Sequence, residues 1–283
     1  MTAPTLARES AATRLNVEFR TISMVWRREL IRFLRSGPRV VTGFVQPILF
    51  LFVLGAGLSP LVGSTSGLDF KKFVFPGVVA MSVITTALFS AISIVWDREF
   101  GFLREMLVAP VSRSSLVLGK AMGGATVATI QGAVMLVLAP LIGVRLTPLV
   151  VIEVLGIAFL MAFALTGFGV FVASRVTKME NFQVVMQFLM FPMLFLSGAL
   201  FPVNGLPHWL TFLTRIDPLT YAIDPLRRVV FAAQDVPAAA LERFGTGVEL
   251  LGHRLSIVTD LLIVAAFALC FLLVAIRSFG RPE

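Results

Sequence analysis

The chain has 283 residues, of which 57% are hydrophobic and only 14% are charged. Soluble globular domains have about a quarter of their residues charged, so this composition, with a mean hydropathy of +0.92, excludes an ordinary soluble protein and indicates an integral membrane protein. The net charge is +8, but a chain this apolar is not typical of nucleic-acid binding, and we expect no nucleic-acid partner.

Residues 1–16 are predicted to form a polar tail, and residues 17–37 an amphipathic helix that ends at Gly37 and Pro38. Its apolar face is formed by Phe19, Ile22, Trp26, Leu30 and Phe33, and its opposite, cationic face includes Arg27, Arg28 and Arg32. Such a helix beside a membrane span is expected to lie in the interface, with its arginines facing anionic headgroups. The alternative is a helix that packs on a partner protein.

Six long apolar runs follow, and each is long enough for a hydrocarbon core about 30 Å thick, which needs roughly 20 helical residues. The runs are continuously apolar, without the alternation of a β-barrel, and therefore predict an all-α integral membrane protein. The transmembrane domain is expected over residues 38–278, followed by a tail at 279–283. The six spans are placed at about 40–60, 73–96, 115–142, 150–174, 181–202 and 255–277.

An even number of spans places both termini on the same side of the membrane. That side would hold 16 of the 24 lysine and arginine residues, so the positive-inside rule predicts cytoplasmic termini in a multi-pass protein of the cytoplasmic membrane. The first apolar run begins only near Val40, after mostly polar residues, and we expect no cleaved signal peptide.

The loop between the second and third spans, residues 97–114, is rich in charge and begins DREFGFLREMLVAP. Phe100, Leu103 and Leu107 recur at helical spacing, with charges of both signs beside them, and Pro110 stops the pattern. This spacing predicts a short amphipathic helix on the cytoplasmic side. A helix resting on lipid would have an excess of basic residues, so a groove in a soluble protein is the favoured partner.

The fifth span and the segment after it contain further candidate residues. Gln183 and Gln187 share a face near Met190 and Phe191, and these four residues are expected to point inward and either line a pathway or pack within the bundle. Residues 203–232 are predicted to form short re-entrant helices at the outer surface, with a plain outer loop as the alternative. The residues singled out in this segment are Trp209, Pro218 and Tyr221.

Two carboxylates, Glu153 and Asp260, fall near the outer ends of their spans. An intramembrane charge suggests a function, but at this depth water is within one or two helical turns. We expect interfacial or capping roles for both residues.

Motifs for enzymatic chemistry are missing. The stretch SSLVLGKA at 114–121 lacks the first glycine and the final Ser or Thr of a phosphate-binding loop. His208 and His253 lie apart without a cluster of further ligands, so no metal site is expected. We therefore predict a chain without a cofactor of its own and without catalytic activity, and any ATP that powers it must bind to another chain.

These features, in this order, resemble the permease subunits of type-2 ATP-binding-cassette exporters, the family that includes the daunorubicin-resistance-type drug efflux permeases. The resemblance rests on the loop REFGFLREMLVAPVSRSSLVLGK and on the later motifs SGALFP and DPLTY. It covers nearly the whole chain, from about Val17 to Arg277.

The resemblance implies a coupling helix that docks on a separate ATPase subunit, an interfacial N-terminal helix and outer re-entrant helices. It also implies two ATPase subunits, which bind ATP and Mg, and a second permease chain, identical or a close relative. Exported molecules in the family include drugs, lipids and glycolipids. The coupling residues would be Glu99, Phe100, Gly101, Phe102, Leu103, Arg104, Glu105, Met106 and Leu107. The alternative function is an autonomous secondary transporter or channel.

Overall fold

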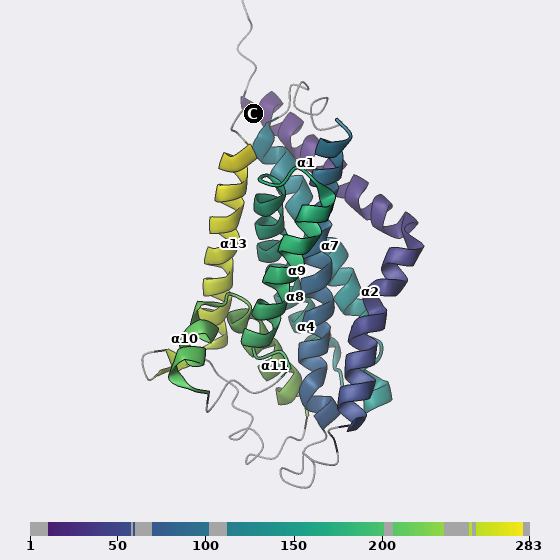
Figure 1. Ribbon diagram of the computed structural model, residues 1–283, viewed down its shortest axis with the longest axis vertical. Helices are drawn as coiled ribbons and strands as arrows, with labels where there is room; N and C mark the ends of the chain where they lie inside the picture. The colour runs from purple at the N-terminus through teal and green to yellow at the C-terminus, as the bar shows by residue number, and fades with distance from the viewer. Residues whose placement is uncertain are drawn as a thin grey trace, which may run out of the picture.

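The computed structural model describes residues 11–57, 59, 70–101, 112–200, 206–234, 249–250 and 253–279. These residues form an elongated bundle in which most helices run along the long axis of the molecule (Figure 1). The fold is all-α, as predicted, apart from a two-residue antiparallel ladder in which β1 (Glu249–Leu250) pairs with β2 (His253–Arg254).

The described residues also form twelve helical segments. In chain order they are α1 (Ala11–Arg35), α2 (Gly37–Leu49), the π-helical η1 (Phe50–Leu54), α4 (Phe70–Ser90), α5 (Ile92–Glu99), α7 (Arg113–Leu136), the 3₁₀ helix η2 (Ala139–Ile142), α8 (Pro148–Ala173), α9 (Met179–Leu196), α10 (His208–Ile216), α11 (Thr220–Ala232) and α13 (Ile257–Phe279).

Five helical stretches of the described chain are long and apolar enough to cross a membrane: Val40–Gly57, Phe70–Glu99, Pro148–Ala173, Met179–Leu196 and Ile257–Ser278. The 24 residues of α7 would also suffice, because a helix of that length measures about 36 Å. However, α7 contains Lys120, Gln131 and several glycines, which lower its hydropathy. A sixth span at α7 therefore stays a prediction, as do the exact span limits.

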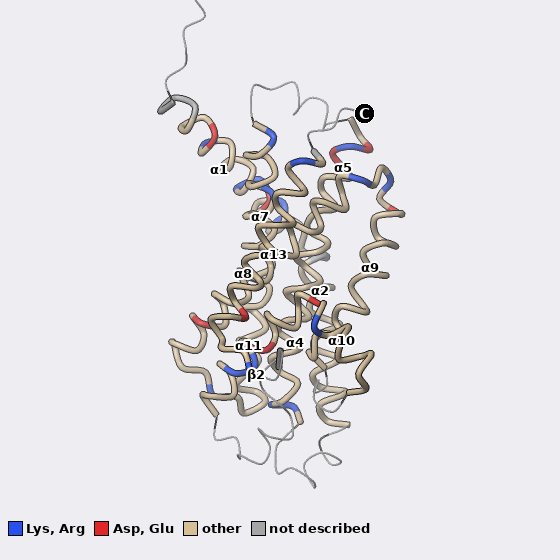
Figure 2. The backbone as a smooth tube through the Cα atoms, turned by 90° about the vertical axis from the view of Figure 1, so that its left-hand side faces the viewer, with Lys and Arg blue, Asp and Glu red and all other residues tan. Residues whose placement is uncertain are grey.

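The two ends of the bundle differ in the elements they contain. The start of α1 and the C-terminal end of α13 lie together at one end, and α10 and α11 lie at the other (Figure 1). We refer to these as the α1 end and the α10 end. Charged residues gather toward both ends, with largely uncharged helix between them (Figure 2). Which end faces the cytoplasm stays a prediction.

Small residues allow close helix packing in the core. A Cβ atom at Gly124 of α7 would lie 2.3 Å from Ser90 Oγ of α4, and one at Gly132 would lie 2.7 Å from a methyl carbon of Val83. Ala128, one turn from each of these glycines, is fully buried. The sequence pattern of small residues at these three positions predicts helix packing, and the structure confirms it.

The connections that start α7 and α8 are capped by hydroxyl groups. Ser112 Oγ accepts a hydrogen bond from the backbone N–H of Ser115 at 3.2 Å, and Thr147 Oγ1 accepts one from Val150 at 3.3 Å. Each hydroxyl satisfies one of the N–H groups that lack a partner at a helix start.

Gly77 of α4 packs against the backbone that follows α9, and this contact predicts a strong effect of substitution. A Cβ atom at Gly77 would lie 1.7 Å from the carbonyl oxygen of Ala199. We expect Gly77→Ala to destabilise the protein by about 1–3 kcal/mol, because backbone rather than a flexible side chain must move. The measurement is denaturant unfolding of the protein in detergent.

Gly156→Ala provides the matched control for this test, since a Cβ atom there meets nothing within 4 Å. An added methyl group in open space is expected to stabilise α8 slightly, by at most about 1 kcal/mol, through the higher helix propensity of alanine. Equal stability of the two variants would contradict the proposed packing of α4 on the turn after α9.

Candidate functional site

A cluster of charged side chains joins three helices at the α1 end. It contains three cations, two carboxylates and one serine hydroxyl, and its members come from α1, α5 and α7. This ion cluster consists of Arg28, Glu29, Arg32, Ser93, Asp97 and Lys120.

Lys120 lies at the centre of the ion cluster and is only 6% exposed. Its Nζ atom lies 2.8 Å from Glu29 Oε1, 3.3 Å from Asp97 Oδ2 and 2.6 Å from Ser93 Oγ, to which it donates a hydrogen bond. Three donors on one ammonium group are thus matched by three oxygens from α1 and α5. This lysine therefore connects α7 to both other helices.

Asp97 joins α5 to α1 through two arginines. Arg28 Nη2 donates to Asp97 Oδ2 at 2.8 Å, and Arg32 Nη2 lies 3.7 Å from Asp97 Oδ1. Both guanidinium groups also lie within 4 Å of Glu29. The arginine side chains are about 40% exposed, whereas the two carboxylates are about 9% exposed. The carboxylates have therefore lost most of their hydration, and they depend more than the arginines on ion-pair partners to offset that loss.

The last turn of α5 connects to four helices through three consecutive charged residues. Asp97 contacts α1 and α7, as described above. Arg98 Nη1 donates to the carbonyl oxygens of Ser174 and Val176 at 3.1 and 3.3 Å, at the end of α8. Glu99 Oε2 accepts a hydrogen bond at 3.2 Å from the backbone N–H of Met179, the first residue of α9. We call Asp97, Arg98 and Glu99 the charged turn.

The predicted coupling helix differs from the structure at its start. α5 ends at Glu99, and Gly101 adopts a φ of 81°, a conformation that favours glycine because it has no Cβ. A single helix from Glu99 through Gly101 to Leu107 is therefore wrong at Gly101. Phe100 is 64% exposed and contacts the ring of Trp96 at 5.3 Å. The remaining predicted coupling residues, 102–107, lie outside the described residues.

The N-terminal helix packs on protein more than the sequence indicates. Its buried stripe is Thr21, Val25 and Glu29, which face α7. Gly119 and Gly123 of α7 allow this approach, because a Cβ atom at either position would lie 2.7 Å from a side-chain carbon of α1.

The outer surface of α1 keeps the features of an interfacial helix. Phe19 and Arg27 are exposed, Trp26 is 37% exposed with its indole N–H bound to Thr126 Oγ1 at 3.0 Å, and Ile22, Leu30 and Phe33 are half-buried. Arg28 and Arg32, predicted to face headgroups, instead pair with Asp97. The location of α1 in the membrane interface stays a prediction.

Short helices occur after the fifth span at the α10 end, where re-entrant helices are predicted. Trp209 of α10 is exposed, Pro218 is half-buried in the connection to α11, and Tyr221 is buried and donates its hydroxyl hydrogen to the carbonyl oxygen of Arg215 at 2.7 Å. Whether these helices enter the membrane stays a prediction.

The connection between α10 and α11 is stabilised by a buried aspartate. Asp217 Oδ1 accepts a hydrogen bond from the backbone N–H of Leu219 at 3.0 Å. Burial raises the pKa of Asp217 to about 8, although this hydrogen bond favours the charged form. Burial of this carboxyl group therefore favours its protonated form over its charged form.

The expected inward direction of the two glutamines of α9 is wrong. Gln183 and Gln187 are exposed on the bundle surface, whereas Met190 is buried. The sulfur of Met190 accepts a hydrogen bond from Thr85 Oγ1 at 3.7 Å. Phe191 is also exposed. The apolar face of α9 packs against α4, so that the amides turn outward, where they make no hydrogen bond with the described residues.

Asp260 is not the interfacial carboxylate that its position suggests. It is fully buried, and its Oδ2 atom lies 4.0 Å from Arg228 Nη2 of α11. Arg228 also lies 2.6 Å from Asp224 Oδ2 and donates to the carbonyl oxygen of Leu255 at 2.8 Å. Asp260 is buried because α11 covers the first turn of α13. Glu153, by contrast, is exposed.

Sequence reasoning missed the ion cluster, although two signals were present. Glu29 is an acidic residue between arginines on the cationic face of α1, and Lys120 follows a loop that begins with Asp97. Neither signal shows by itself which helices lie next to one another. Only the packing of α1 on α7 brings them within contact distance.

Comparison with known proteins places the whole ion cluster within a matched region. The chain matches the ABC-2 type transporter family over residues 20–231. The transport permease named ycf38 of Cyanophora paradoxa is 30% identical over 205 residues, which cover 71% of each chain. Nodulation protein J of Rhizobium leguminosarum bv. trifolii is 32% identical over 214 residues, 73% of this chain and 79% of the relative. The same protein of Rhizobium meliloti (strain 1021) is 32% identical over 217 residues, 74% and 80% of the two chains.

Proposed function

Since this chain belongs to the ABC-2 type transporter family, we propose that it is the permease subunit of an ATP-driven exporter. It moves a hydrophobic or amphipathic molecule, such as a drug, a lipid or a glycolipid, out across the cytoplasmic membrane. ATP, with Mg, is hydrolysed on a separate ATPase subunit, and this chain is not an enzyme. Both of its termini lie in the cytoplasm, so the α1 end faces the ATPase.

The observation that carries this proposal is the charged turn of α5. The predicted coupling segment, residues 99–107, begins at Glu99 of this turn, and its residues 102–107 lie outside the described residues. Asp97, Arg98 and Glu99 connect this point to α1, α7, α8 and α9. A force applied to the loop by a soluble partner would therefore reach four helices at once.

Closure of the ATPase dimer on binding ATP would move the coupling segment and, with it, the charged turn. Because the ion cluster holds α1 and α7 to α5 through contacts of 2.8–3.3 Å, these helices would shift as a unit rather than slide past one another. The membrane spans would then tilt and open a pathway toward the α10 end.

A second permease chain, identical or a close relative, is part of the proposed complex, together with two ATPase subunits. The exposed face of α9 supports this partner, since Gln183 and Gln187 have no hydrogen-bond partner among the described residues. Amides on a span that faces lipid favour contact with another helix. A pathway between two permease chains would use this face.

An autonomous secondary transporter or channel is the second candidate. The buried Asp260, with Arg228 and Asp224 nearby, favours it, because ionisable groups within a bundle are typical of ion-coupled carriers. In that case Asp260→Asn would abolish export, and collapse of the proton gradient would stop it without any change in ATP.

The test of the proposal is purification of the chain from its native membrane in a mild detergent, followed by protein identification and an ATPase assay. We expect a soluble ATPase to co-purify in stoichiometric amount and to hydrolyse ATP. Isolation of the chain alone, inert toward ATP in several mild detergents, would overturn the proposal and favour the autonomous carrier.

A further inference from the structure

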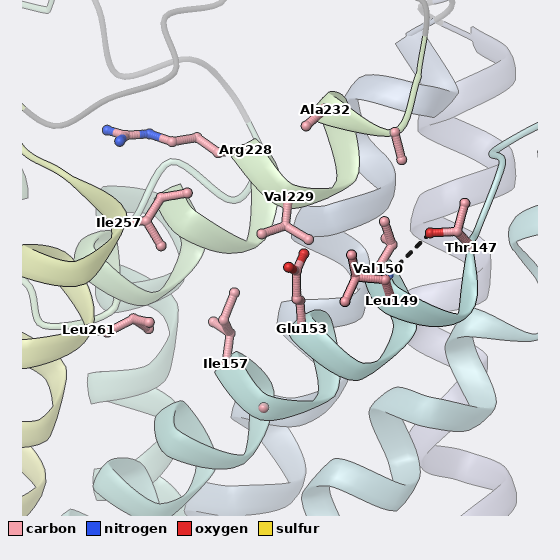
Figure 3. A pocket seen from close by; sticks show the side chains of 12 residues that line it. Thr147, Leu149, Val150, Glu153, Ile157, Arg228, Val229, Ala232, Ile257 and Leu261 are labelled. Carbon is pink, nitrogen blue, oxygen red and sulfur yellow. Dashed lines mark hydrogen bonds between the residues drawn. The ribbon is translucent and has the colours of Figure 1, made fainter.

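A pocket of about 670 Å³ opens between α8, α11 and α13 near the α10 end (Figure 3). Its walls are largely apolar, and a carboxylate, Glu153, points into it. The walls are formed chiefly by Val150, Ile157, Val229, Ile257 and Leu261. A pocket of this size suits a small amphipathic molecule or part of a lipid.

The depth of the pocket is set by the starts of two membrane spans. Glu153 lies in the second turn of α8, which begins at Pro148, and Ile257 and Leu261 belong to the first turns of α13. At 1.5 Å per residue, Glu153 lies roughly 8 Å along the helix from the end of the span. In a helix that spans the membrane, such a position lies near the boundary between the lipid headgroups and the hydrocarbon.

Glu153 has no compensating partner among the described residues. Its carboxylate makes no hydrogen bond or ion pair with them. Glu153 is exposed at the surface of α8, which is one of the candidate membrane spans. Arg228, which also lines the pocket, is directed away from Glu153 (Figure 3) and is held by Asp224 and the carbonyl oxygen of Leu255. A carboxylate at this depth requires a cation or a strong donor to offset its loss of water.

We propose that this pocket binds an amphipathic molecule with a protonated primary amine, whose ammonium group donates to Glu153 and whose hydrocarbon chain lies on the apolar walls. The amine can come from a membrane lipid such as phosphatidylethanolamine or from a free amphipathic amine. The site requires only that α8 and α13 lie in a membrane, so it stands or fails independently of the ATP-driven export proposed above.

The test is native mass spectrometry of the full chain in detergent, with equal amounts of phosphatidylethanolamine, phosphatidylcholine and phosphatidylglycerol added after delipidation. We expect binding of phosphatidylethanolamine to exceed that of the other two lipids by about tenfold, the effect of one charge-assisted hydrogen bond. Phosphatidylcholine is the sharp comparison, because its nitrogen carries a charge but cannot donate. Dodecylamine, compared with dodecanol, probes a free amine.

Two variants test separately the charge of Glu153 and the shape of the pocket, and a third variant serves as the control. Glu153→Gln is expected to abolish the preference for amines. Gly156→Leu keeps the charge but fills the pocket, since a side chain there enters open space, and is expected to reduce binding of every probe. Glu180→Gln makes the same charge change on an exposed first turn at the α1 end and is expected to leave the preference intact.

The outcomes distinguish the two sources of the amine. If the chain prefers phosphatidylethanolamine and Glu153→Gln removes this preference, the ligand of the pocket is a membrane lipid. Binding of dodecylamine alone, again lost in Glu153→Gln, assigns a free amphipathic amine. Equal binding of all probes, or an amine preference unchanged in Glu153→Gln, overturns the proposal.

Discussion

Asp97→Asn is expected to destabilise the protein by about 3–5 kcal/mol, the usual result of removing one partner from a buried ion pair. The side chain keeps its shape, but Arg28 loses its partner at 2.8 Å and the buried Lys120 keeps only one carboxylate. Denaturant unfolding of the purified protein in detergent measures the loss. Glu18→Gln, an exposed neutralisation on α1, is the control and is expected to change stability by less than about 0.5 kcal/mol.

A second substitution tests whether charge balance explains this loss. In Asp97→Asn the ion cluster has three cations and a single anion, and adding Lys120→Met restores the original net charge. We expect the double variant to recover most of the stability, because replacing a buried ion pair by an uncharged pair is often nearly neutral. Stability of Asp97→Asn within 1 kcal/mol of the original protein would contradict the importance of the cluster.

The double variant also tests whether the ion cluster transmits movement from α5 to α1 or only stabilises the fold. It folds without the contacts between Asp97 and the arginines of α1, so ATP binding is expected to move α5 but no longer α1. Spin labels at the exposed Met24 of α1 and at Phe212 of α10, which lies at the opposite end of the bundle, report the movement of α1, in a background where the single cysteine, Cys270, is replaced by Ala. An ATP-dependent distance change as large as in the original protein would show that the cluster stabilises without coupling.

Phe100→Ala is expected to weaken retention of the ATPase by about tenfold to thirtyfold, because exposed aromatic side chains are common anchors of protein interfaces. Phe100 is 64% exposed next to the coupling segment, and Trp96, its ring neighbour, is also exposed. The measurement is the amount of ATPase that co-purifies at rising dilution. Stability should be unchanged, since the ring buries little surface within the chain.

Phe212→Ala is the matched control, because Phe212 is 62% exposed but lies in α10 at the opposite end. It should retain the ATPase fully. Loss of the ATPase in Phe212→Ala but not in Phe100→Ala would reverse the assignment of the two ends. Charge reversal of Glu99 is a less selective test, since it also removes the hydrogen bond to Met179 at the start of α9.

The sequence by itself determined the membrane class, the helical fold and the approximate positions of five spans, because hydropathy and helix stop signals are local properties. It also determined the amphipathic character of α1 and the small-residue stripe of α7. The family resemblance depended on short motifs such as LVAPVSR and DPLTY, which can be read without any knowledge of packing.

Only the tertiary structure decided where polar side chains point. Glu29, Asp97 and Lys120 are up to 91 residues apart in the chain, and their contacts exist because α1 packs across α7 rather than facing only lipid. The same reason turns Gln183 outward and buries Asp260 beneath α11. Hydropathy records how apolar a helix is, whereas the direction of each charge depends on which neighbour covers that face.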